Sequence, residues 1–169
     1  MVINQWFNNE FLPEGSAWVA RQTAQNILEE LGEEFDWVNR VSIELTTQML
    51  ATLFDFPFED RAKLTRWSDL ATADENSGIV DSEDQRREEL MECLTYFGRL
   101  WQERAGKPGD DLISMLANGE STKDMLDRPA EYLGNLILLI VGGNDTTRNS
   151  LTGGVLALNQ FPAEFDKLK

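Results

Sequence analysis

Apolar residues recur at intervals of three and four along most of the chain, the spacing that places them on one face of an α-helix. Glycine and proline residues divide the chain into segments of this kind, and no segment shows the sustained alternation of an exposed strand. Apolar stripes predict helices around residues 20–31, 41–53, 62–70, 90–101 and 112–116. The pattern therefore predicts an all-α protein.

Capping signals agree with these helices. Ser16 and Gly32 are placed to begin and end the first helix, and Ser82 with Gln85 forms a capping box before the stripe at 90–101. The polar stretch 72–81 predicts a loop between helices, and residues 118–127 predict a polar link.

The longest predicted helix begins at Pro129, where a first-turn proline belongs, and runs to Gln160 before Phe161 and Pro162 break it. A further helix opens at Pro162, and its pattern is still incomplete at Lys169. We therefore expect residues 1–169 to be a single incomplete helical domain of a longer protein, with 129–160 as its central helix.

Composition and charge narrow the possible functions. The chain has 15 basic and 30 acidic residues, a net charge of −15, one cysteine and no histidine. The absence of histidine excludes any mechanism that needs imidazole from this chain, and one cysteine excludes an internal disulfide. The acidic balance disfavours nucleic acid and anionic membranes as partners. Neither a leader peptide nor a membrane span is predicted, so we expect a cytoplasmic protein.

The middle of the long helix carries the most unusual residues. Residues 142–147 read Gly-Gly-Asn-Asp-Thr-Thr and interrupt an apolar run. Glycine weakens a helix, and Thr146 can turn its hydroxyl onto the carbonyl of Gly142, so the helix should widen or bend here. Helical spacing places apolar side chains, a glycine backbone and side chains able to transfer protons on one face of this helix. Such a face could form the wall of a cavity for an apolar substrate. The residues on this face are Leu138, Leu139, Gly142, Asp145, Thr146 and Asn149.

Two other interpretations of this segment remain open. In the first, the glycines allow close helix packing, the threonines bond their own backbone, and Asp145 pairs with Arg148 or Asn149. In the second, the apolar run is a buried strand, and residues 142–146 form a phosphate-binding turn before a helix. The second is weaker because the P-loop lysine is absent and no other segment alternates like a strand.

Residues 142–147 match [AG]-G-x-[DE]-T-T, the signature of the long central helix in cytochrome P450 monooxygenases. Blocks 35–69 and 133–159 resemble the soluble bacterial branch that hydroxylates medium-chain alkanes at the terminal carbon. The resemblance extends from about residue 35 to the end of the chain. It implies a segment of the mostly α cytochrome P450 fold, with the sheet and the haem-ligand loop absent.

The resemblance also implies roles for individual residues. Gly142, Gly143 and Thr147 would form the groove over the distal haem face, and Thr146 would hydrogen-bond the bound oxygen or its water. Asp145 would relay protons, which is general acid work without histidine. Leu138 and Leu139 would touch the substrate or the haem. The family further implies a hydrophobic small-molecule substrate, and NAD(P)H as reductant through a ferredoxin reductase and a ferredoxin.

The chain departs from the family pattern at the metal. The family's axial cysteine loop, and the Glu-x-x-Arg helix before it, have no counterpart in this sequence. Glu83 to Arg86 matches the tetrapeptide but precedes the central helix, so we interpret it as a solvated first turn. Cys93 lies on an apolar helical face and is interpreted as a core residue, which leaves no metal ligand and predicts that the chain alone is inactive. The alternative function is an acidic helical binding or scaffold module without haem.

Overall fold

The computed structural model describes residues 16–74 and 76–167, and this part of the chain is helical with no strand. This confirms the predicted all-α class. The elements in chain order are α2 (Ser16–Glu29), η1 (Val38–Ile43), α3 (Glu44–Phe54), η2 (Phe58–Asp60), α4 (Ala62–Thr72), α5 (Glu83–Arg104), α6 (Leu112–Asn118), η3 (Met125–Asp127), α7 (Pro129–Gln160) and α8 (Pro162–Asp166).

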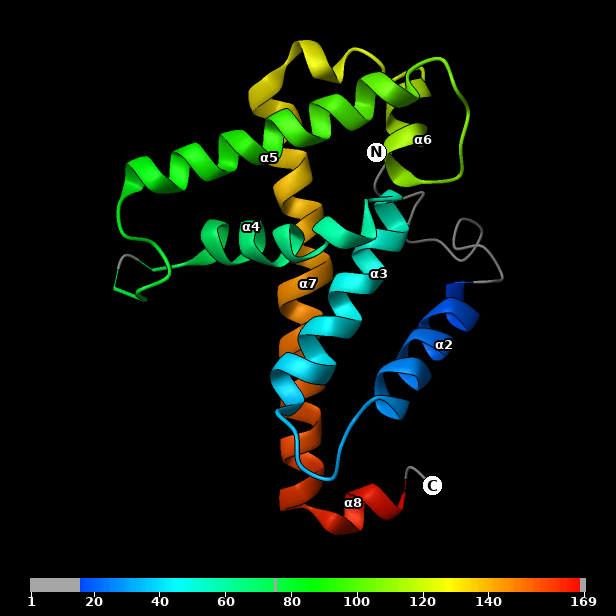
Figure 1. Ribbon diagram of the computed structural model, residues 1–169, viewed down its shortest axis with the longest axis vertical. Coiled ribbons are helices and arrows are strands. Elements are labelled where there is room, and N and C mark those ends of the chain that lie inside the picture. The colour runs from blue at the N-terminus through cyan, green and yellow to red at the C-terminus, as the bar shows by residue number, and fades with distance from the viewer. Residues whose placement is uncertain (1–15, 75, 168–169) are drawn as a thin grey trace.

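Helix α7, with 32 residues, is the axis about which the other helices are arranged (Figure 1). Helix α3 lies against the half of α7 nearer the C-terminus, and α4 and α5 cross the half nearer its start. Helix α2 packs on the outer side of α3, and α8 turns away at the far end of α7. One long stretch of α7 therefore has helices on one side only.

Local signals place the ends of the helices. Ser82 Oγ accepts a hydrogen bond from Gln85 N at 3.2 Å, and Gln85 Oε1 accepts one from Asp81 N at 2.7 Å, which confirms the predicted cap of α5. Asp111 caps α6 in the same way through Ser114 N at 2.9 Å. The proline at the start of α7 occupies the first helical turn, as its missing N–H favours.

The core lies where α3, α4, α5 and α7 meet. Phe54 and Phe97 make an edge-to-face contact with centroids 5.2 Å apart, and Phe56 stacks on Tyr96 at 4.7 Å. Trp67 is 1% exposed and closes this aromatic cluster. Aromatic side chains bury large apolar areas, so this cluster holds the crossing helices firmly against α7.

Two short elements differ from the sequence prediction. The segment predicted as one helix around 41–53 begins as a π-helix, η1, before it becomes α3. Thr47 Oγ1 donates to Ile43 O at 2.7 Å at this junction, and such side-chain bonds to the preceding turn loosen the α-helical ladder. The predicted polar link at 118–127 contains the 3₁₀ turn η3, within which Met125 is buried.

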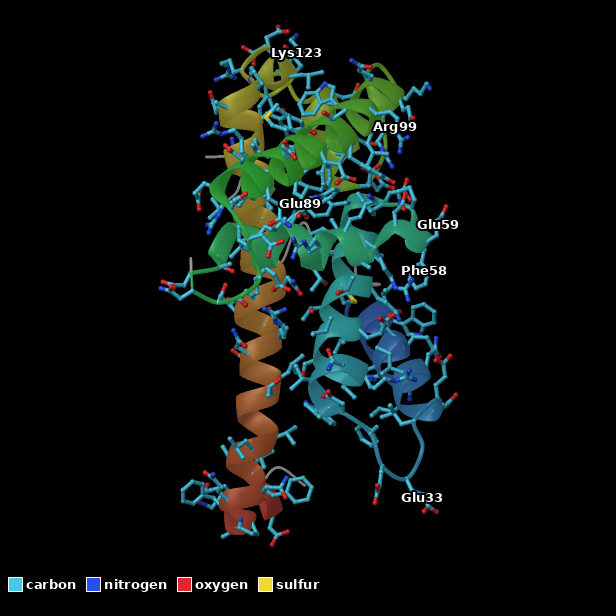
Figure 2. The ribbon with its side chains drawn as sticks, turned by 60° about the vertical axis from the view of Figure 1, so that its left-hand side comes forward. Glu33, Phe58, Glu59, Glu89, Arg99 and Lys123 are labelled. Carbon is cyan, nitrogen blue, oxygen red and sulfur yellow. The ribbon has the colours of Figure 1, made fainter. Side chains whose placement is uncertain are left out.

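Charged side chains cover the outer surface of α5 and its neighbours (Figure 2). Glu89 pairs with Arg66 of α4 at 2.6 Å, and the Arg99 guanidinium lies 4.6 Å from the Tyr96 ring centroid. Across the described residues, no helix combines the length and the apolar character needed to cross a bilayer.

Candidate functional site

The buried face of α7 is a single stripe with a spacing of four residues. Tyr132, Leu136, Ile140 and Asn144 are each 0% exposed and point toward the core. The Tyr132 hydroxyl donates to Phe97 O at 3.2 Å. This stripe decides which of the remaining α7 residues face away from the other helices.

The opposite face of α7 is open at the motif. Leu138 is 61% exposed, and Gly142, Thr146 and Thr147 are also exposed. A Cβ placed on Gly142 would meet no atom within 4 Å. Thr146 Oγ1 donates to Gly142 O at 2.7 Å, the backbone bond that the sequence predicts. The structure thus brings a bare backbone, a hydroxyl and an apolar side chain together on one uncovered surface.

The two neighbouring glycines have different surroundings. A Cβ on Gly143 would lie 2.7 Å from Leu50 Cδ2, which is closer than real side chains approach. Leu50 is 3% exposed in the core. Gly143 therefore serves the close packing of α7 on α3, while Gly142 leaves the helix bare on its open side.

Asp145 lies at the edge of the open face and is held by a cation. Arg148 Nη2 donates to Asp145 Oδ1 at 2.6 Å, and Asn149 Nδ2 donates to the same oxygen at 3.3 Å. Arg148 Nη1 also donates to Asp69 Oδ1 of α4 at 3.0 Å. Burial of the guanidinium opposes its charge, but the hydrogen bonds of both carboxylates outweigh it and raise the pKa of Arg148.

The predicted wall of the cavity is not a single surface. Leu139 is half-buried and packs against the core, whereas Leu138, one position earlier, is open. Successive helical residues are about 100° apart, and here that step turns Leu139 toward the core while Leu138 stays exposed. Of the pair, Leu138 is the one that shares a face with Gly142 and Thr146.

The structure adds residues that sequence reasoning did not select. Thr46 Oγ1 of α3 donates to Asn144 Oδ1 at 2.8 Å, and both residues are buried. Thr152 Oγ1 donates to Ser42 Oγ at 3.0 Å further along the same interface. One signal was available for Asn144, because it falls four residues after Ile140 in the apolar stripe.

The surroundings of Cys93 differ from those of the open face of α7. It is 0% exposed within the core cluster, and burial, together with the charge of Glu92, raises the pKa of its thiol to about 12. A thiol with such a pKa is protonated at neutral pH and does not act as a thiolate ligand.

Arg86 Nε lies 3.1 Å from Glu83 Oε1 in the first turn of α5, an ion pair within one helix. The part of the chain that the structure describes holds no cluster of three or more metal-ligating His, Cys, Asp or Glu side chains.

The interpretation of residues 142–146 as a phosphate-binding turn after a strand is wrong. The apolar run before the glycines is helical and continuous with α7, so no strand-to-helix turn exists to hold a phosphate. The glycines lie inside a helix, where their N–H groups bond to the preceding turn.

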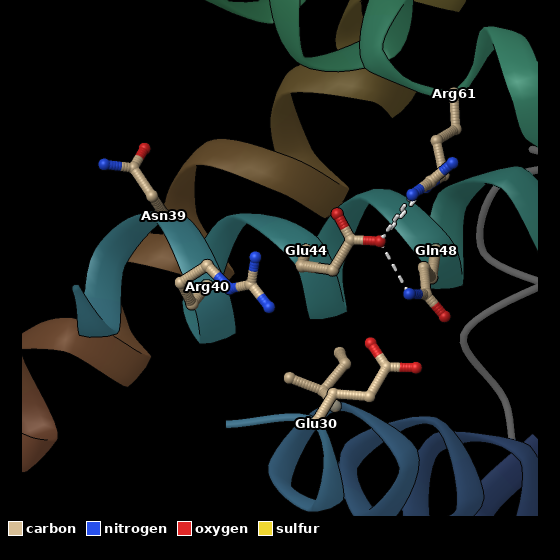
Figure 3. A pocket seen from close by; sticks show the side chains of 7 residues that line it. Glu30, Asn39, Arg40, Glu44, Gln48 and Arg61 are labelled. Atoms are coloured by element: carbon tan, nitrogen blue, oxygen red, sulfur yellow. Dashed lines mark hydrogen bonds and ion pairs between the residues drawn. The ribbon is translucent and has the colours of Figure 1, made fainter. Parts of the chain in front are cut away.

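A polar cleft of about 230 Å³ lies elsewhere, between the end of α2 and the start of α3. Arg61 Nη2 and Gln48 Nε2 converge on Glu44 Oε1 at 2.9 and 2.6 Å, and Glu30 lies across the cleft (Figure 3). No residue of 142–147 lines this cleft. Its internal ion pair joins Arg61, between η2 and α4, to Glu44 of α3.

Comparisons with known proteins place the chain in a wider context. No family model matches it. Steroid C26-monooxygenase of Mycolicibacterium smegmatis is 34% identical over 134 residues, which cover 79% of the chain and 31% of that relative. Two solved structures are 44% identical over 97% of the chain: cytochrome P450-153 from Novosphingobium aromaticivorans, with a TM-score of 0.77, and CYP153D17 from Sphingomonas sp. PAMC 26605, with a TM-score of 0.78.

The chain spans about a third of the length of the curated relatives it matches, between 30% and 38%. It covers 39% and 41% of the two solved structures. The matches agree in sequence and in helical arrangement, and the Gly-Gly-Asn-Asp-Thr-Thr residues lie in the middle of α7. The chain belongs to the cytochrome P450 family, and it is part of a cytochrome P450 sequence.

Proposed function

We propose that this segment belongs to a haem-thiolate monooxygenase that hydroxylates apolar substrates, and specifically the terminal carbon of medium-chain n-alkanes. The single observation that carries the proposal is the open face of α7, where bare Gly142 and the Thr146 hydroxyl lie beside exposed Leu138. The alkane preference is supported by the sequence resemblance to the alkane-hydroxylating branch. The 44% identity with cytochrome P450-153 agrees with it.

The open face suits the distal side of a haem. A planar, largely apolar group needs a surface without protruding side chains, and Gly142 offers bare backbone with no atom within 4 Å of a Cβ position. Leu138 would add apolar contact to the haem or the substrate. In this proposal Gly142 and Thr147 line the distal groove, and Gly143, which the family resemblance also assigns to the groove, supports it from the packed side through its contact with Leu50. The thiolate comes from a part of the protein other than the buried Cys93.

When bound, the haem supplies the iron at which dioxygen is activated. Thr146 holds a proton on Oγ1, now donated to Gly142 O, and a rotation about its side-chain bond would aim it at the open face. Asp145 can accept a proton from solvent and pass it inward when Arg148 releases it. Leu138, which is exposed here, would exclude water from the apolar side once the haem covers it, and this would protect proton transfer from leakage.

The electrons would come from NAD(P)H through a ferredoxin reductase and a ferredoxin, the partners that the family resemblance implies. A hydrophobic small molecule is the proposed substrate.

The experiment compares Thr146→Ala and Thr146→Ser in the complete haem protein that contains this segment. We expect the alanine variant to consume NAD(P)H with little hydroxylated product, and the serine variant to retain most of the product because it keeps the hydroxyl. Thr95→Ala is the matched control, since Thr95 Oγ1 makes the same bond to Met91 O at 2.8 Å on α5. An unchanged product yield in Thr146→Ala would contradict the proton role of Thr146.

A further inference from the structure

The fully buried amide of Asn144 stands out on the packed face of α7. The same stripe is apolar at Leu136 and Ile140, and all three residues are 0% exposed. Among the described residues, Asn144 Nδ2 has no hydrogen-bond partner, and its Oδ1 accepts from Thr46 at 2.8 Å. Burying an amide whose two N–H donors have no partner costs free energy compared with a leucine at the same place. Stability alone therefore gives no reason for an asparagine here.

The position of the pair suggests another reason. Thr46 and Leu50 are one turn apart on α3, and they contact the adjacent residues Asn144 and Gly143 of α7. Helix α3 therefore contacts α7 on the side opposite the open face. An apolar contact between a leucine and a glycine depends little on direction, so it allows one helix to slide or rotate against the other. A hydrogen bond between two side chains forms in one register of the two helices. Fixing register is the best-attested use of buried polar groups.

We propose that Thr46 and Asn144 are a positioning pair, which fixes the rotation of α7 so that Gly142 and Thr146 face the haem side. This inference rests on the proposed function, because the orientation of Thr146 has consequences only where its hydroxyl acts on a bound group. Neither residue touches that group, since both are buried on the opposite side of the helix. A change of one residue in the register would turn the motif by about 100° and change the direction in which Gly142 and Thr146 point.

The test uses four variants of the complete haem protein. Thr46→Val keeps the shape of the side chain and removes the hydroxyl, and Thr46→Ser keeps the hydroxyl. Thr46→Val combined with Asn144→Leu makes both partners apolar, which should restore stability lost in the single variant. Thr152→Val is the matched control, because it removes the other hydrogen bond of the interface, at 3.0 Å to Ser42 Oγ, two turns from the motif.

The readouts are product formed per NAD(P)H, thermal stability, and amide hydrogen exchange of residues 142–147 in the haem-free protein. We expect Thr46→Val to lower coupled turnover by about tenfold to a hundredfold, the range for a misplacement of about 1 Å. Its hydrogen exchange across the motif should rise. Thr46→Ser should retain both properties. The double variant should regain stability without regaining coupling.

Two results would overturn the inference. One is a double variant that recovers coupling together with stability, because the pair would then be a purely structural contact. The other is a Thr152→Val variant that loses as much coupling as Thr46→Val at the same loss of stability. Failure of the proposed function gives a different outcome, because the unsubstituted protein would then bind no haem or form no product.

Discussion

Arg148 Nη1 lies 3.0 Å from Asp69 Oδ1, and this ion pair joins the centre of α7 to α4. The same guanidinium holds Asp145 through Nη2 at 2.6 Å, so one side chain connects the motif to a neighbouring helix. The Arg148 side chain is 15% exposed. One guanidinium therefore links α4 to the carboxylate at the edge of the open face.

The first prediction is that Asp69→Asn destabilises the protein modestly. The substitution leaves Arg148 half-paired, and a partly exposed ion pair contributes up to about 1 kcal/mol. The free energy of unfolding, measured with urea, should fall by that amount in low salt and by less in 1 M salt, since salt screens the pair. Glu103→Gln is the control, because Glu103 and Arg99 are each 59% exposed and 3.8 Å apart. Equal losses in the two variants would show that the Asp69 pair has no special weight.

Local sequence patterns predict the helices and part of the candidate site. The proline at 129 and the Phe-Pro pair at 161–162 are strong breaking signals, and α7 has the bounds Pro129–Gln160. The bonds from Thr146 to Gly142 O and from Arg148 to Asp145 involve residues three or four apart on one helix. Such contacts follow from helical geometry alone, so they could be predicted without a tertiary fold.

Contacts between distant segments could not be predicted in this way. Thr46 and Asn144 are 98 residues apart in sequence, and nothing in either helix alone identifies the partner. The different roles of Gly142 and Gly143 depend on which of them α3 approaches. The π-helix η1 is a further case, because it packs against α7 and its Ser42 is buried there, contacts that the sequence of this segment alone does not reveal.

The second prediction is that alanine at the two glycines has opposite effects on stability. Gly142→Ala meets open space in this chain and should raise the free energy of unfolding by up to about 1 kcal/mol, because alanine favours the helix. Gly143→Ala should lower it by up to about 2 kcal/mol, because the overpacking cost of a Cβ that meets Leu50 Cδ2 at 2.7 Å within the core exceeds the helix preference of alanine. Urea unfolding of both variants gives the comparison.

A second-site substitution checks the cause of the Gly143 effect. Leu50→Ala removes the methyl group that the new Cβ meets, so Gly143→Ala should cost much less in that background than alone. If its cost is the same with and without Leu50, the close contact with α3 is not what requires glycine there.

The third prediction concerns Cys93 and alkaline pH. Burial raises the pKa of its thiol from about 9.0 to about 12, so the folded state keeps the proton at pH values where the unfolded state loses it. This contribution to stability is complete below about pH 9 and is lost as the pH rises toward 12. Cys93→Ala should remove that part of the pH dependence. In the unsubstituted protein, thiol labelling at pH 8 should proceed only as fast as the protein opens, and labelling at the rate of a free thiol would show that Cys93 is accessible.

The fourth prediction is that the 169-residue chain binds a fluorescent apolar dye along α7. Leu138 and Leu156 are 61% and 59% exposed on this helix, and Phe161 at its end is 62% exposed. Large apolar side chains exposed along one helix in this way mark places where something else packs. Leu138→Gln combined with Leu156→Gln should lower the fluorescence markedly, whereas Met91→Gln, which removes an exposed side chain from α5, should leave it nearly unchanged. Dye binding that is insensitive to the α7 changes but lost with Met91 would place the adhesive surface on α5 and remove the main support for a haem against α7.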